Sequence, residues 1–135
     1  MENYNINLRN LSTSDSIMIE IKKLDLFNHP KQFSEMNDQL YDQYNLMVKL
    51  TNDPKVETAK SFNIVDNYGS VVLKHEYSYG FPNDAKIEGL VTIAKYVKEH
   101  NLVPKPIDQK FVDKTIRDHK RFYCKLPSYI KKAIN

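Results

Sequence analysis

The chain has 135 residues and a mass of 15.9 kDa, with a formal net charge of +3, 41% hydrophobic residues and 27% charged residues. This length fits one domain with a single core, and the ordinary composition argues against a wholly disordered chain. No apolar run approaches the ~20 residues of a membrane-spanning helix, and the segment from Met1 to Asn10 lacks the layout of a signal peptide. We therefore expect a small cytoplasmic single-domain protein without a membrane partner.

The residue usage also indicates a cellular compartment and the kind of genome that encodes the protein. The single cysteine, Cys124, has no second cysteine with which to form an intramolecular disulfide, which fits a reducing compartment. Lysine outnumbers arginine 17 to 3, and asparagine and isoleucine reach 13 and 11, a bias that an AT-rich coding sequence produces. This bias points to a low-GC bacterium, a virus, a phage or a mobile element, and for a phage protein the compartment is the host cytoplasm.

The first predicted element is a β-hairpin, because apolar residues alternate with polar ones on both sides of the turn-forming residues 12–15. The alternating apolar residues are Tyr4, Ile6, Leu8, Ile17, Ile19 and Ile21. Isoleucines at a period of two favour a strand. A competing interpretation caps a helix at Ser14 or Asp15.

A helix is predicted next, over about residues 31–50. Its apolar residues recur at spacings of three and four along one face, and they are Phe33, Met36, Leu40, Tyr44 and Met47. Asn52, Asp53 and Pro54 are expected to end this helix.

A second β-hairpin is predicted from residues 62–65 and 71–79, joined by a turn at residues 66–69 in which Gly69 can take a positive φ. Asn83 or Asp84 is then expected to cap a helix that ends near His100 and Asn101. The apolar stripe of this helix consists of Ile87, Leu90, Val91, Ala94 and Val97.

The last part of the chain is predicted to be helical. Pro104 and Pro106 interrupt the chain, Asp108 can cap a helix that runs to about Lys125, and Pro127 can open a short final helix. The expected fold is α+β, with an antiparallel sheet from two β-hairpins, helices packed on one face and two C-terminal helices. Residues 1–103 form the expected hairpin-helix-hairpin-helix body, and residues 107–135 form a basic helical segment.

This basic segment carries the strongest charge signal in the chain. Residues 110–135 contain eight Lys or Arg against two Asp, a local charge of about +6, so the first 109 residues are near −3. The cations opposite the apolar side of the predicted helix, with those that flank them, are Lys110, Lys114, Arg117, Lys120, Arg121 and Lys125. Such a row can follow a phosphate backbone, although an ordinary solvated helix face has a similar composition.

Tyrosines and phenylalanine near the second hairpin suggest another surface. Tyr77, Tyr79 and Phe81 are the kind of aromatic anchors that dominate protein interfaces. Aromatic residues on this strand can also stack on unpaired bases, but the face that holds Leu73 and His75 has the composition of one packed on helices.

Glu20 and Lys22 match the Glu-X-Lys part of a restriction-type nuclease signature, in which the carboxylate holds Mg²⁺ and the lysine polarises the attacking water. On the predicted strand, these residues also need a second carboxylate, usually on a neighbouring strand, for which Asp66 and Glu76 are the candidates. It is short and common in a Lys-rich chain, and it supports only weak catalytic candidates.

We therefore predict a non-enzymatic nucleic-acid-binding protein, phage- or element-encoded, that contacts phosphates through its basic C-terminal helix. The first alternative is a protein-binding inhibitor or adaptor that docks on an acidic surface of its partner. The second alternative is a metal-dependent nuclease. No cofactor and no metal site are expected, because the histidines lack the paired spacing of a zinc site and no glycine-rich phosphate loop is present.

Overall fold

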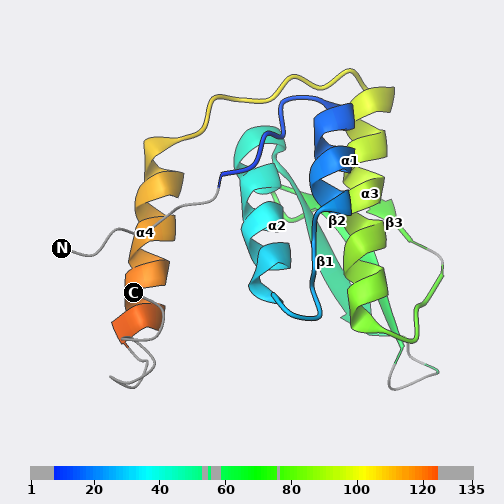
Figure 1. Cartoon of the computed structure of the whole chain (residues 1–135). Coiled ribbons are helices and arrows are strands. Elements are labelled where there is room, and N and C mark those ends of the chain that lie inside the picture. The colour runs from blue at the N-terminus through cyan, green and yellow to red at the C-terminus, as the bar shows by residue number, and fades with distance from the viewer. Residues whose placement is uncertain (1–7, 53–54, 56–58, 76, 125–135) are drawn as a thin grey trace. The chain divides into compact units, whose positions relative to one another are not determined.

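The computed structural model describes residues 8–52, 55, 59–75 and 77–124, without the side chains of residues 115 and 118–124. The described elements are α1 (Ser14–Lys22), α2 (Lys31–Tyr44), β1 (Leu46–Asn52), β2 (Lys60–Asp66), β3 (Val71–Lys74), α3 (Pro82–Glu99) and α4 (Gln109–Cys124) (Figure 1). The chain forms two compact units. The central unit is Arg9–Pro106, and the terminal unit combines Met1–Leu8 with Ile107–Asn135.

The sheet of the central unit is antiparallel, with the strand order β1-β2-β3. The tight connection between β2 and β3 uses Gly69 at a φ of 78°, and Asp66 Oδ1 accepts hydrogen bonds from the backbone N–H groups of Tyr68 and Ser70, each at 2.9 Å. An aspartate that bonds its own turn in this way stabilises a tight reversal of the chain. The predicted second hairpin is thus confirmed in its turn and antiparallel pairing, with an irregularity between Ile64 and Val65. Its second strand is shorter than the predicted residues 71–79, because β3 ends at Lys74 and Tyr79 forms only an isolated bridge with Lys60.

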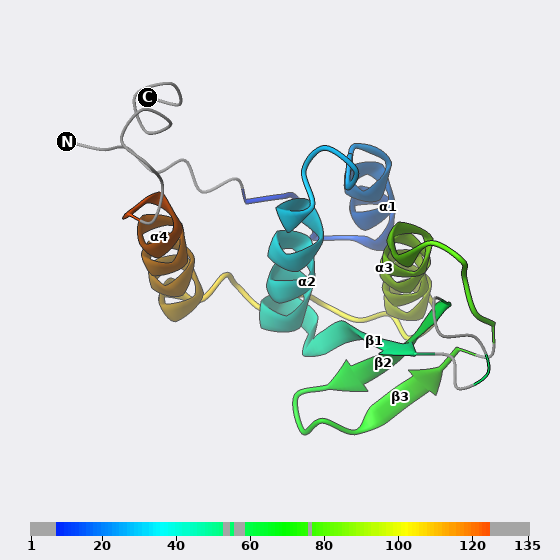
Figure 2. The same ribbon diagram turned by 90° about the horizontal axis from the view of Figure 1, so that it is seen from below.

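Helices α1, α2 and α3 lie on one side of the sheet (Figure 2). Helix α3 packs on β1 and β2, α2 packs on β1, and α1 packs on α3. The core between these layers is built from Leu11, Ile17, Ile21, Leu26, Phe33, Met36, Leu40, Tyr44, Leu46, Val48, Phe62, Ile64, Leu90, Ile93, Ala94 and Val97. The predicted α+β class, with helices packed against one face of an antiparallel sheet, is therefore confirmed.

The predicted N-terminal hairpin is wrong where the structure describes it, because residues 14–22 form α1. Thr13 caps this helix: its Oγ1 accepts from the Ser16 N–H at 3.1 Å, and Ser16 Oγ accepts from the Thr13 N–H at 2.9 Å. Ile17 and Ile21, four residues apart, are buried, whereas Ile19 between them is 54% exposed. The helical cap and the four-residue spacing outweigh the strand preference of isoleucine. Residues 1–7 lie outside the described residues.

The predicted helix over residues 31–50 is too long. Helix α2 ends at Tyr44, because Asn45 adopts a left-handed conformation with φ of 58°, and β1 begins at Leu46. Asparagine is one of the few residues other than glycine that takes this conformation readily at a helix end. The sheet is consequently a run of three antiparallel strands rather than two hairpins.

The two later helices are confirmed, but the caps expected for α3 are wrong. Helix α3 begins at Pro82 after the N-cap Phe81, so Asn83 and Asp84 lie inside its first turn, and it ends before Asn101, whose φ is 51°. Asp108 precedes α4, and its Oδ1 accepts from the Lys110 N–H at 2.9 Å. The short helix expected after Pro127 lies outside the described residues. In the part of the chain that the structure describes, no helix has the length and apolarity needed to cross a membrane.

Candidate nucleic-acid interface

Helix α4 separates apolar side chains from cationic ones. Its apolar residues Phe111, Val112 and Ile116 are half-buried, whereas Lys110, Lys114 and Arg117 are exposed. The exposed cations follow one another at spacings of four and three residues, so each is about one helical turn from the next, and the row extends over roughly 10 Å of helix. The predicted basic face is therefore exposed in its first half, and it can meet an extended anion.

One carboxylate accompanies these cations. Asp113 is exposed, and its Oδ1 accepts a hydrogen bond from Gln109 Nε2 at 3.0 Å. Three exposed cations against this one acid leave the described part of the helix surface positive. The remaining predicted contact residues lie outside the described side chains, and they are Lys120, Arg121 and Lys125.

The aromatic residues after β3 divide into two kinds. Tyr77 and Phe81 are both 73% exposed, whereas Tyr79 is half-buried against the core. The backbone of Tyr79 exchanges two hydrogen bonds with Lys60, at 2.9 and 2.7 Å. Tyr79 therefore holds the chain to the sheet, and only Tyr77 and Phe81 are available as anchors for a partner.

The ring of Tyr79 packs in a small aromatic cluster. The His75 ring stacks on Phe62 with 4.3 Å between centroids and on Tyr79 with 5.5 Å, and His75 Nε2 lies 2.8 Å from the Tyr79 hydroxyl oxygen. Burial raises the pKa of Tyr79, and the nearby carboxylates of Glu88 and Asp84 raise this pKa further. These contacts give His75 a structural role, as expected for a strand face that packs on helices.

The weak catalytic candidates Glu20 and Lys22 do not lie on a strand, so the geometry proposed for a nuclease is wrong. Both residues belong to α1, where positions two apart point to different sides of the helix. Glu20 Oε1 instead forms an ion pair with Lys23 Nζ at 3.2 Å. Among the described residues, no three His, Cys, Asp or Glu side chains gather where they could hold a metal ion.

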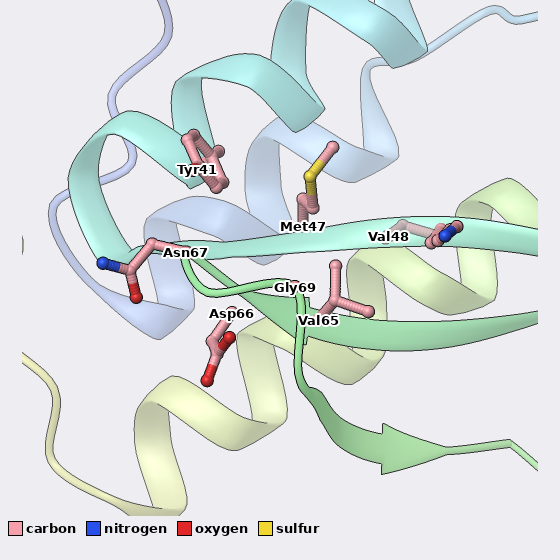
Figure 3. A pocket seen from close by; sticks show the side chains of 8 residues that line it. Tyr41, Met47, Val48, Val65, Asp66, Asn67 and Gly69 are labelled. Atoms are coloured by element: carbon pink, nitrogen blue, oxygen red, sulfur yellow. The ribbon is translucent and has the colours of Figure 1, made fainter.

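The structure also shows a hollow that the sequence does not predict. It has a volume of about 400 Å³ and opens between the end of α2, the strands β1 and β2 and the β2–β3 turn (Figure 3). Its lining residues are Tyr41, Met47, Val48, Lys49, Val65, Asp66, Asn67 and Gly69. The sequence gives no sign of it, because Met47 fits the apolar stripe of the expected helix over residues 31–50, whereas Leu46–Asn52 is a strand whose side chains alternate between two sheet faces.

The comparisons of this chain with protein-family models, with curated proteins and with solved structures each returned no match.

Proposed function

We propose that the protein binds nucleic acid through the exposed basic side of α4. The observation that supports this proposal is the separation on α4 of the exposed Lys110, Lys114 and Arg117 from the half-buried apolar side. Each cation that neutralises a phosphate releases a condensed counterion, which makes affinity fall as salt rises and leaves it nearly independent of base sequence.

The distribution of charge supports the same surface. The central unit contains 12 Lys or Arg against 13 Asp or Glu, whereas residues 107–135 contain eight against three. A polyanion is therefore attracted to the terminal unit, and the nearly neutral central unit adds little long-range attraction.

The test is the binding of purified protein to single- and double-stranded DNA and RNA, titrated with salt from about 50 to 200 mM. The variant Lys114→Glu/Arg117→Glu should lower the affinity by about tenfold or more at the low end of this range, and it should flatten the salt dependence. The matched control is Lys95→Glu/Lys98→Glu, which makes the same change in net charge at exposed positions of α3. Equal losses in the two variants, or no binding by the wild type, would refute the proposal.

A second candidate function is a protein-binding module that docks on an acidic partner, with Tyr77 and Phe81 as anchors. The high exposure of these two large aromatic side chains favours it, because such residues contribute most when they enter a pocket on a partner. Tyr77→Ala/Phe81→Ala should then abolish capture of one specific partner while the circular dichroism spectrum is unchanged. Phe27→Ala, which removes a ring that is 87% exposed on another part of the central unit, is the matched control.

A further inference from the structure

One face of the sheet carries no helix within the central unit. Helices α1, α2 and α3 all lie on the other side of β1, β2 and β3 (Figure 2). We call the uncovered side the outer face. The strand pairing and the alternation of side chains assign to it Met47, Lys49, Thr51, Ser61, Asn63, Val65, Val71 and Lys74.

The outer face is organised in rows across the strands. Lys49 pairs with Asn63, and Asn63 pairs with Lys74, so two exposed lysines flank one amide in a single row. Neighbouring strands lie about 4.8 Å apart, which places the backbones of the two lysines roughly 10 Å from each other. This separation lets the two flexible ammonium groups contact one phosphate or two successive phosphates of an extended strand.

The next row is apolar and borders the hollow described above. Met47 pairs with Val65, and Val65 pairs with Val71, whose side chain is 55% exposed. The side chains of Met47 and Val65, with Tyr41 from α2, line the hollow in Figure 3. A volume of about 400 Å³ lies within the range of small-molecule sites, and it can hold one planar heterocycle against an apolar wall.

The charge of this surface favours an anion. None of the residues assigned to the outer face is acidic, and neither Lys49 nor Lys74 forms an ion pair with a described residue. Asp66 is the one acid that lines the hollow, and its Oδ1 already accepts from two backbone N–H groups of the β2–β3 turn. Lysines beside an apolar hollow match a ligand with an anionic group next to a flat apolar ring.

We propose that the outer face binds an unpaired nucleotide of a single-stranded nucleic acid. Its base enters the hollow beside Tyr41, Met47 and Val65, and its backbone phosphates lie over Lys49 and Lys74. This inference rests on the nucleic-acid binding proposed for α4. It adds a preference for single strands over duplexes, which α4 alone does not supply. A base paired within a duplex cannot enter the hollow without being flipped out, so the outer face selects single strands.

The first test compares affinities for a single-stranded oligonucleotide and for the matching duplex. Lys49→Glu/Lys74→Glu should weaken single-strand binding about tenfold while duplex affinity changes less than about twofold. Lys114→Glu/Arg117→Glu should weaken binding to the single strand and to the duplex. The control Lys95→Glu/Lys98→Glu should cause a clearly smaller loss of affinity for each of the two. If Lys49→Glu/Lys74→Glu lost equal affinity for the single strand and the duplex, or lost affinity for neither, the inference would be overturned.

The second test detects the base itself. The chain contains no tryptophan, so Tyr41→Trp places a single tryptophan at the hollow, and its emission can be excited apart from that of the remaining tyrosines. A saturating single-stranded oligo-dT should quench its fluorescence, because a base then stacks beside the indole. Heparin, a polyanion without bases, should leave the fluorescence unchanged. An unchanged signal with oligo-dT, or an equal change with heparin, would overturn the placement of the base.

These measurements separate the failures of the two proposals. If the wild type binds no nucleic acid at low salt, the function proposed for α4 fails, and with it the inference built on it. If the wild type binds and Lys114→Glu/Arg117→Glu weakens that binding while Lys49→Glu/Lys74→Glu does not, only the inference about the outer face is overturned.

Discussion

The central unit and helix α4 distribute apolar and charged residues in different ways. The central unit buries a continuous core between its helices and its sheet, and its charges are nearly balanced. Helix α4 has apolar residues that are only half-buried, and its exposed side is mainly cationic. This difference indicates that packing in the central unit supplies most of the stability, whereas the charge of α4 is available for a ligand.

Two buried amide side chains of the central unit, Asn37 and Gln39, each pair with both backbone groups of a distant residue. Asn37 of α2 accepts from the Val48 N–H at 2.8 Å and donates to the Val48 carbonyl at 3.0 Å. Gln39 forms the same pair of bonds with the backbone of Arg9, at 3.0 and 2.6 Å. These amides satisfy backbone groups that no further strand pairs with. Because both backbone groups of Val48 are bonded to Asn37, another strand cannot pair with the edge of β1 at this residue.

The largest effect that separates the two regions should come from Phe62→Ala. This ring is 1% exposed, and it supports both the core and the stacked His75. Removal of a buried phenylalanine costs about 3–5 kcal/mol of unfolding free energy through lost burial and a cavity. Urea denaturation measures this loss. Ile116→Ala, at a half-buried position of α4, should cost less than about 1.5 kcal/mol, and equal costs would show that both regions are packed alike.

A smaller loss is expected for Asn37→Ala, which leaves both backbone groups of Val48 without their partners. Each unsatisfied buried group costs about 1–3 kcal/mol. Because β1 is an edge strand, water can reach the two freed groups, so we expect costs near the lower end of this range and a total loss of roughly 2–4 kcal/mol of unfolding free energy. Asn67→Ala, at an exposed position of the β2–β3 turn, is the control and should change stability by no more than about 0.5 kcal/mol. Similar losses in both variants would argue against a special role of the buried amide.

The smallest of these effects should come from Gly89→Ala in α3. A Cβ at this position would lie 2.5 Å from Val48 Cγ1, so the buried valine must shift. Overpacking of this kind costs about 1–3 kcal/mol, although alanine is otherwise the better helix former. Thermal unfolding should show that the same change costs less in a Val48→Ala background. An undiminished cost in the double-mutant cycle would place the strain elsewhere.

The two wrong element assignments have a common physical cause. Ile17, Ile19 and Ile21 fit a strand by their spacing and type, but the cap at Thr13 and the burial of only Ile17 and Ile21 make the segment helical. Met47 fits the helical stripe of α2, but the left-handed Asn45 stops that helix before it. In both cases one residue at an element boundary outweighed a periodicity that extends over only a few residues.

By itself, the sequence determined the features that depend on neighbours along the chain: the β2–β3 turn, helix α3 and the amphipathic, basic character of α4. Only the tertiary structure decided which distant residues meet. It stacked His75 on Phe62 while it left Tyr77 and Phe81 exposed, and it aligned Lys49, Asn63 and Lys74 in one row. Such rows depend on strand register, which is set by burial of one sheet face against α2 and α3 and not by local spacing.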